Sequence, residues 1–273
     1  LGATEAFLAR RPQLLVGGSW DWAAINALLL GFIPAMAFAV GVRLFPLFLR
    51  MRLAYRQFLG AVALFLGGGT VLLVAGVLPG AGRLSGLGAL LLAPGLLFGA
   101  VTVRVFEPRL TFPGDQGRYS VWKDPAALGV LTAFCWLSAA AVLLLLYGLQ
   151  YFGLVVTPGV ISHVLPAHAL GAGFLTLLLL GVGSILLPGF GGTRPVNSWL
   201  IWLAVGAGNA AAILRVGPLA WVTLSPWAGA AWWFLPAVAL SGVVGVLAVG
   251  TFAAYLWQVL TAAPSEKGAA ERV

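Results

Sequence analysis

Long apolar runs alternate with short polar connections along almost the whole chain. An α-helix needs about 20 predominantly apolar residues to cross the hydrocarbon core of a bilayer, and each run is near or above that length. We therefore predict membrane-spanning helices at about residues 22–44, 57–78, 84–106, 125–150, 161–187, 197–216 and 232–260. The predicted fold is all-α, a polytopic transmembrane helix bundle of about seven spans that forms a single domain over residues 1–273.

Two of these boundaries have local signals in the sequence. Asp124-Pro125 places a capping carboxylate before a proline at the first helical position, a combination typical of a helix start. Leu187-Pro188-Gly189 closes the fifth apolar run and predicts a helix stop.

The first and fifth spans share a sequence pattern. The segment NALLLGFIPAMAFAVGVRLFPLF, which starts at Asn26, aligns without gaps with HALGAGFLTLLLLGVGSILLPGF, which starts at His168, an offset of 142 residues (168 − 26). Both have Gly-Phe near the head and Pro-x-Phe at the foot. Internal repeats recur in polytopic membrane folds with sites between the halves. We predict that the two spans are equivalent, in halves over about residues 20–124 and 125–273; chance alignment of Gly- and Leu-rich segments is the alternative.

Composition supports a membrane protein and excludes several other classes. Hydrophobic residues make up 61% of the chain and charged residues 8%, whereas about a quarter of the residues in soluble domains are charged. The net charge of +8 does not indicate nucleic-acid binding, because the arginines lie in short connections and form no basic face with interleaved aromatics. The single cysteine, Cys135, excludes a disulfide framework and a Cys-based metal signature.

The basic residues are distributed unevenly between alternate connections. The first, third and fifth connections and the C-terminal tail hold Arg50, Arg52, Arg56, Arg109, Arg118, Lys123, Arg194, Lys267 and Arg272. The other side holds little beyond Arg10, Arg11, Arg83 and Arg215. By the positive-inside rule the C-terminus is cytoplasmic and the N-terminus is outside. The chain begins with leucine and shows no signal peptide, so either its true start has been removed or more chain preceded it, and upstream spans would account for an N-terminus outside.

The only two histidines, His163 and His168, lie at the outer mouth of the fifth span. Ionisable residues inside membranes are functional candidates, and a neutral imidazole can bind a metal or hold haem iron axially. Gly171 and Gly173 beside His168 leave room for a flat ligand or another helix. We therefore take His168 as a candidate cofactor and metal ligand; the alternative is a hydrogen-bonded histidine that packs two helices.

His163 is a second candidate for cofactor binding, five residues before His168. This spacing puts the two rings about 140° apart on one helix, so they share no metal unless the helix breaks at Pro166. A solvated interfacial histidine is the alternative. Two histidines are too few for a haem-copper oxidase core, so any second ligand comes from methionine, tyrosine or another chain.

Arg43 is the third candidate, near the cytoplasmic end of the first span and three residues before Pro46. There it is placed to pair with a haem propionate or a lipid phosphate, and snorkelling to the head groups is the alternative. In the sixth span Arg215 has no acidic neighbour in sequence, and Asn209 is placed to hydrogen-bond across helices.

Two motifs resemble those of the NnrS-type membrane proteins associated with the nitric-oxide response. HALGAGFLTLLLLGVGSILLPGFGG resembles the family's HAL-x-x-GF segment ending in R-x-L-P-x-F-x-G, and GFIPAMAFAVGVRLFPLFL resembles its span ending in R-x-x-P-x-F. The family is described as bundles of about twelve helices that contain haem and copper and protect against nitrosative stress. The resemblance fits the later part of such a protein. It implies that His168 is the motif histidine, Arg43 the motif arginine, and Pro46 and Pro188 the two helix stops.

The chain departs from the family pattern in two respects. Ser184 and Ile185 stand where an arginine usually precedes the second Leu-Pro, and the family's upstream His-rich segment is absent. Haem b is therefore the cofactor that the resemblance implies, while the departures weigh against copper.

Two functional hypotheses follow. One is a haem-binding membrane protein linked to nitric-oxide or respiratory electron-transfer metabolism. The other is a non-catalytic transmembrane subunit of a larger respiratory or photosynthetic complex, which has other membrane subunits as partners. Both place the chain in the inner (cytoplasmic) membrane of a prokaryote, in contact with the lipid bilayer and not with nucleic acid. A solute transporter is a third class, but no charged or broken-helix site at mid-membrane indicates it.

Overall fold

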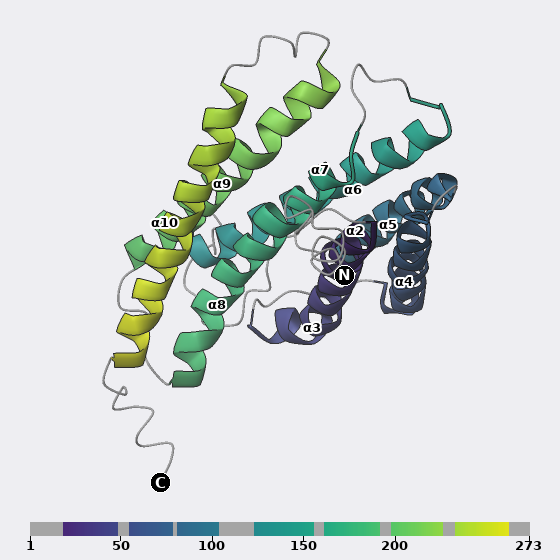
Figure 1. Cartoon of the computed structure of the whole chain (residues 1–273). Coiled ribbons are helices and arrows are strands. Elements are labelled where there is room, and N and C mark those ends of the chain that lie inside the picture. Colours follow the sequence, from purple (N-terminus) through teal and green to yellow (C-terminus); the bar gives the residue numbers. More distant parts are fainter. Residues whose placement is uncertain are drawn as a thin grey trace, which may run out of the picture.

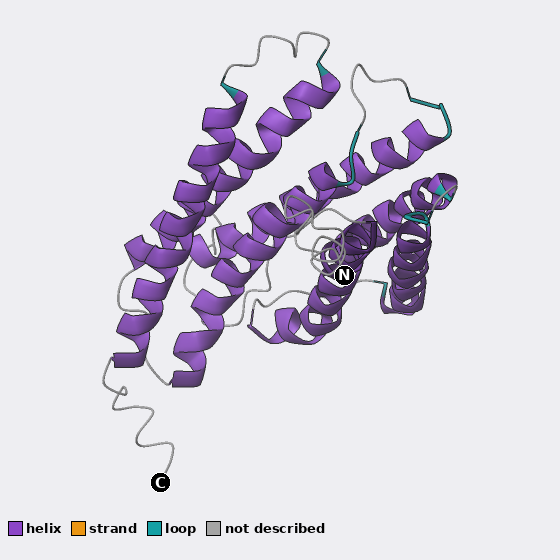
Figure 2. Cartoon of the chain, in the orientation of Figure 1, coloured by secondary structure: helices purple, strands orange, loops and turns teal. Residues whose placement is uncertain are grey.

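The computed structural model describes residues 19–48, 55–78, 81–103, 123–155, 161–191, 198–225 and 233–261. Within these ranges the chain is helical apart from a few turn and loop residues at the helix ends (Figure 2). In order they are α2 (Ser19–Asn26), η2 (Ala27–Phe32), α3 (Ile33–Phe48), η3 (Arg56–Phe58), α4 (Leu59–Ala75), α5 (Gly82–Val103), α6 (Pro125–Tyr151), α7 (Val164–His168), η5 (Ala169–Leu175), α8 (Thr176–Gly191), α9 (Ser198–Leu224) and α10 (Phe234–Thr261). Here η2 and η5 are π-helical and η3 is a 3₁₀ turn.

The predicted transmembrane bundle is confirmed. Six helical stretches of the described chain are long and apolar enough to span a membrane: Asp21–Leu44, Gly82–Val103, Pro125–Tyr151, Val164–Pro188, Trp199–Leu224 and Phe234–Thr261. Leu59–Ala75 is a shorter apolar helix that corresponds to the predicted second span. A backbone in lipid must satisfy its own hydrogen bonds, and the helices do so within each segment. The chain is a multi-pass membrane protein.

One predicted helix start is confirmed, and three predicted ends are too early; the first span continues past residue 44 and through Pro46, a predicted helix stop, to Phe48. The Asp124 carboxylate caps α6, because its Oδ1 accepts hydrogen bonds from the backbone nitrogens of Ala126 (3.0 Å) and Ala127 (3.3 Å). The helix at Pro188 continues through it to Gly191, and the sixth span continues past residue 216 to Leu224. A proline removes one backbone donor without ending a helix whose neighbours still pack against it, so neither proline of these two helices ends its helix.

The helices form two pairs around a central group. α4 packs along α5, α9 packs along α10, and α6 with the α7–η5–α8 span lies between the pairs (Figure 1). The core between them is apolar, and Phe134 of α6 meets Phe38 of α3 and Phe174 of η5 edge-on. The central spans thereby bring residues of the two predicted halves into contact.

Glycine permits the closest helix approaches. A Cβ added to Gly69 of α4 would lie 2.9 Å from the backbone oxygen of Gly88 in α5, which is closer than real side chains come. A Cβ on Gly181 of α8 would lie 2.8 Å from the backbone oxygen of Ala126 in α6. Transmembrane helices pack without a hydrophobic force between them, so small residues at such crossings gain van der Waals contact.

The repeated sequence coincides with a repeated backbone feature. Asn26 is followed at once by the π-helical segment Ala27–Phe32, and His168 by the π-helical segment Ala169–Leu175. Their starts are separated by the same 142 residues (169 − 27). π-Helical turns are rare, so their recurrence at this offset agrees with the predicted repeat. The extent of the two halves stays a prediction.

Candidate functional site

His168 is positioned by a change of helix type inside the membrane span. It is the last residue of α7, and the wider π-helical turn of η5 begins directly after it. π-Helical turns occur frequently at functional sites. Thr176, at the start of α8, donates a hydrogen bond of 3.0 Å from Oγ1 to the backbone oxygen of Gly171. The hydroxyl thus satisfies a carbonyl of the irregular turn, as a lipid-embedded backbone requires.

A cavity of about 390 Å³ lies beside His168. It is bounded by η5, α8, α9 and α10, and its lining is His168, Ala172, Thr176, Gly208, Ala211, Arg215, Ser241, Gly242, Gly245, Ala248 and Val249. Seven of these are glycine, alanine or valine, so small side chains form most of the cavity wall. The polar groups are an imidazole, a guanidinium and two hydroxyls, with no carboxylate among them.

Arg215 is the functional candidate that the sequence did not connect to His168. The two side chains are half-buried and line the same cavity from different spans. Arg215 lies nine residues before Leu224, the end of its span, so it is about 14 Å inside by helix rise. His168 is four residues inside its own span, or about 6 Å deep. The signal available in the sequence was an arginine without an acidic neighbour near the end of the predicted sixth span, and the continuation of α9 to Leu224 places it deeper.

The glycines next to His168 in the sequence are not the small residues that line its cavity. Gly173 packs against α6, since a Cβ there would lie 2.5 Å from the indole ring of Trp136. Gly171 has open space beside it, and neither glycine lines the cavity. The small residues of the walls are instead Gly208 on α9 and Gly242 and Gly245 on α10, together with alanines.

A hydrogen-bond network fixes α9 next to the cavity. Trp136 donates from Nε1 to Oδ1 of Asn209 at 3.3 Å, and Asn209 donates from Nδ2 to Oγ1 of Thr132 at 3.2 Å. Asn209 also donates to the backbone oxygen of Val205 at 3.0 Å. The predicted cross-linking role of Asn209 is therefore observed, and it holds α6 against α9 one residue from the cavity wall at Gly208.

His163 occupies a different environment from His168. Its ring meets Trp22 of α2 edge-on, with centroids 5.0 Å apart and planes at 72°. His163 Nε2 is buried and, within the part of the chain that the structure describes, has no hydrogen-bond partner. The same is true of Oδ1 of Asn26, the counterpart of His168 in the repeat, which is only 2% exposed. His163 does not line the cavity of His168, so the two histidines are not brought together.

Arg43 lies apart from both histidines. It is exposed on α3, five residues before the end of that helix at Phe48, and it does not line the cavity of His168. The connection arginines Arg50, Arg52, Arg109, Arg118 and Arg194 and the tail residues Lys267 and Arg272 lie outside the described residues. The predicted orientation of the chain in the membrane therefore stays a prediction.

The described residues contain no group of three or more histidine, cysteine, aspartate or glutamate side chains placed to hold a metal ion. What the cavity can do follows from its own groups: one imidazole offers a ligand nitrogen, and one guanidinium offers charge-assisted hydrogen bonds to an anion. Comparison of the chain with family models, with characterised proteins and with solved structures finds no match.

Proposed function

We propose that this membrane protein binds one haem b in the cavity of His168 and acts in nitric-oxide or respiratory electron-transfer metabolism, as the resemblance to the NnrS-type family implies. The observation that carries the proposal is the pairing of His168 with Arg215 in one small-residue cavity. A haem needs an axial ligand, room for a flat ring and cations for its carboxylates. The lining offers one imidazole and one guanidinium beside a cavity of about 390 Å³, which supports the proposal.

His168 would supply the axial nitrogen. The lining contains no second histidine and no cysteine or methionine, so the protein offers one ligand from within the cavity. A haem carries its own ring nitrogens, whereas a protein site for copper or zinc needs several side-chain ligands. A single imidazole therefore favours haem over a bare metal ion. When bound, haem iron supplies a site for a diatomic ligand or for one-electron transfer.

Arg215 would hold the carboxylates. A charged side chain inside a bilayer is costly unless it is paired, and the cavity lining provides no acid for it. A haem propionate is an anion that would arrive with the ligand and form charge-assisted hydrogen bonds to the guanidinium. Arg215 thus takes the role for which the sequence suggested Arg43.

Absorption spectra of the purified protein, oxidised and reduced, test the proposal. We expect a Soret band in the wild type, loss of that band in His168→Ala, and weaker haem retention in Arg215→Gln than in Arg215→Lys. His163→Ala is the matched control, because it removes the other imidazole outside the cavity, and it should keep the band. A wild-type protein without haem, or a His168→Ala spectrum like that of the wild type, would overturn the proposal.

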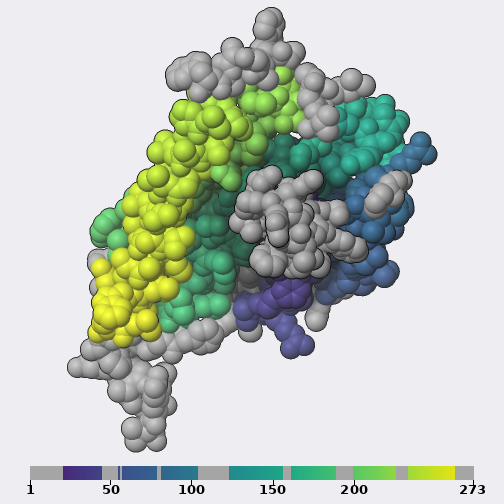
Figure 3. All heavy atoms as spheres, in the orientation of Figure 1, coloured from purple at the N-terminus to yellow at the C-terminus, as the bar shows by residue number. Residues whose placement is uncertain are grey.

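A second candidate is a transmembrane subunit of a larger complex, and the outer face of α10 favours it. Leu235, Val243, Val246, Trp257 and Leu260 are each at least 68% exposed there. α10 forms one flank of the molecule (Figure 3). These exposed side chains can contact lipid or another subunit. Recovery of the protein together with a second membrane polypeptide after mild solubilisation would support the hypothesis that it is a subunit of a larger complex.

A further inference from the structure

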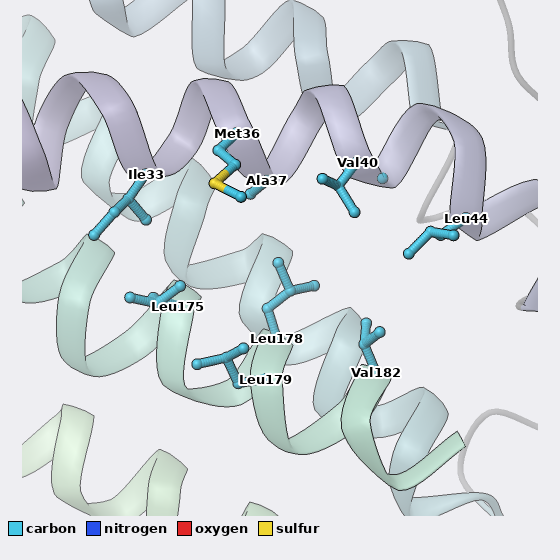
Figure 4. Close-up of a pocket in the computed structure, with 10 residues that line it drawn as sticks. Ile33, Met36, Ala37, Val40, Leu44, Leu175, Leu178, Leu179 and Val182 are labelled. Atoms are coloured by element: carbon cyan, nitrogen blue, oxygen red, sulfur yellow. The ribbon is translucent and has the colours of Figure 1, made fainter. Parts of the chain in front are cut away.

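An apolar groove of about 240 Å³ lies between α3 and the η5–α8 segment, away from the cavity of His168. Its walls are aliphatic, methionine and glycine residues, and none of the lining residues has a polar side chain. Figure 4 shows Met36 and Val40 of α3 pointing toward Leu178 and Val182 of α8. Nothing in the groove can hydrogen-bond a polar ligand, so its occupant must be an apolar chain.

The two walls are built from matching positions of the sequence repeat. Met36 and Leu178 are separated by 142 residues (178 − 36), and so are Val40 and Val182 (182 − 40). Two further lining pairs have the same offset. The groove therefore lies where the two predicted halves face each other, the position at which repeat-built membrane folds place their binding sites.

The groove has the depth of one leaflet. On α3 it runs from Ile33 to Leu44, about 17 Å along the helix by helix rise. Ile33 lies near the middle of the helical stretch that runs from Ser19 to Phe48, and Leu44 lies four residues, about 6 Å, before its end. The hydrocarbon core is about 30 Å thick, so the groove extends from near the bilayer centre toward the head groups on one side. This is the extent of a lipid acyl chain, not of a transmembrane helix.

Arg43 lies next to Leu44 in the second half of α3, at the edge of the groove-lining face. Residues seven apart on an α-helix are about 20° apart around its axis, so Arg43 lies two turns beyond Met36 and nearly in line with it along α3. Its side chain is exposed, and no described residue forms an ion pair with it. Arg43 lies five residues, about 8 Å, before the end of α3 at Phe48, and its long side chain can extend to the head groups and bind a phosphate by charge-assisted hydrogen bonds.

We propose that the groove between α3 and α8 binds one acyl chain of an anionic phospholipid, whose phosphate pairs with Arg43. The lipid would fill the space between the two halves and act as a structural ligand in the leaflet opposite to the cavity of His168. This site does not depend on haem binding, because the two sets of lining residues have no member in common.

Native mass spectrometry of the purified full chain, incubated with dioleoyl phosphatidylglycerol or with dioleoyl phosphatidylcholine, tests the proposal. We expect one phosphatidylglycerol per chain to survive removal of detergent, with phosphatidylcholine retained about fivefold less, the ratio expected for about 1 kcal/mol per arginine at the membrane surface. Arg43→Gln should lose this preference, and Arg43→Lys should keep most of it. Arg83→Gln is the matched control, an exposed arginine of α5 outside the groove, and it should behave as the wild type.

Filling the groove tests the acyl-chain site separately. Ala37→Trp places an indole among the lining residues and should reduce retention of both lipids, whereas Val246→Trp, at a 74% exposed position on α10, should not. Equal retention of the two lipids by the wild type would overturn the proposal, as would a bound polypeptide in place of a lipid. If Ala37→Trp fails to fold by circular dichroism, the comparison of Arg43→Gln with Arg83→Gln decides, since both changes are on exposed side chains.

Discussion

At the scale of single residues, Asn209 joins α9 to α6 through two hydrogen bonds inside the membrane. Interhelical hydrogen bonds of this kind contribute about 0.6 kcal/mol each on average. Asn209→Ala should therefore lower the free energy of unfolding by about 1 kcal/mol, measured by denaturant titration in detergent. Thr223→Val is the control, because the Thr223 hydroxyl bonds only to Leu219 of its own helix, and it should change stability little.

The partner residue provides a second check on the same contact. Trp136→Phe removes the indole donor and keeps an aromatic ring against Gly173. Because both substitutions remove one shared bond, the double variant should lose less stability than the two single losses added together. Strict additivity would show that the Trp136–Asn209 bond does not form in the membrane protein.

At the scale of helices, the triplet Gly67-Gly68-Gly69 of α4 allows the effect of helix–helix packing on stability to be compared with the effect of helix propensity. A Cβ on Gly69 would meet the backbone of α5, while Gly67 and Gly68 have nothing within 4 Å. Gly69→Ala should destabilise the protein by about 1–3 kcal/mol through forced separation of α4 and α5. Gly67→Ala and Gly68→Ala should stabilise it by up to about 1 kcal/mol, since alanine favours the helix. Thermal unfolding in detergent measures all three, and equal effects would contradict the crossing.

The two π-helical turns show what a repeated sequence preserves and what it changes. Both follow a polar residue at the head of the motif, Asn26 in the first span and His168 in the fifth. Asn26 is almost fully buried against its neighbours, whereas His168 lines a cavity. The backbone form is common to both spans, and the candidate chemistry belongs to the second alone.

At the scale of the whole molecule, the two candidate sites lie toward opposite ends of the fifth span. The cavity reaches from His168 to mid-membrane, and the groove of Met36 and Val182 runs from mid-membrane toward the other end. With the predicted orientation, the cavity faces outward and the groove lies in the cytoplasmic leaflet.

Cysteine labelling of intact cells tests that orientation. The native Cys135 is exposed, so it is first replaced by alanine. Ser162→Cys, at an exposed position before α7, should react with an impermeant thiol reagent added from outside. Asp115→Cys, in the third connection, should react only after the membrane is opened. The reverse pattern would show that the positive-inside assignment is wrong.

The sequence by itself determined the helices and the location of most of them. Crossing a bilayer depends on the length and apolarity of each segment alone, because a backbone in lipid must form its hydrogen bonds internally. The start of α6 at Asp124 was equally readable, since the cap and its two amides are three residues apart at most. The ends of α8 and α9 could not be read from the sequence. Each helix continues beyond its internal proline, because neighbouring helices pack against it there.

Only the tertiary structure decided which of these helices share a site. His168 and Arg215 are 47 residues apart (215 − 168), and both were visible in sequence as intramembrane polar residues. Their common cavity depends on Gly208, on the Arg215 face of α9, and on Gly245 of α10, and neither glycine gave a separate signal in the sequence. The groove of Met36 and Val182 likewise arises from the approach of two spans. Segment apolarity is a local property, whereas the faces that meet are chosen by complementary packing between residues far apart in the chain.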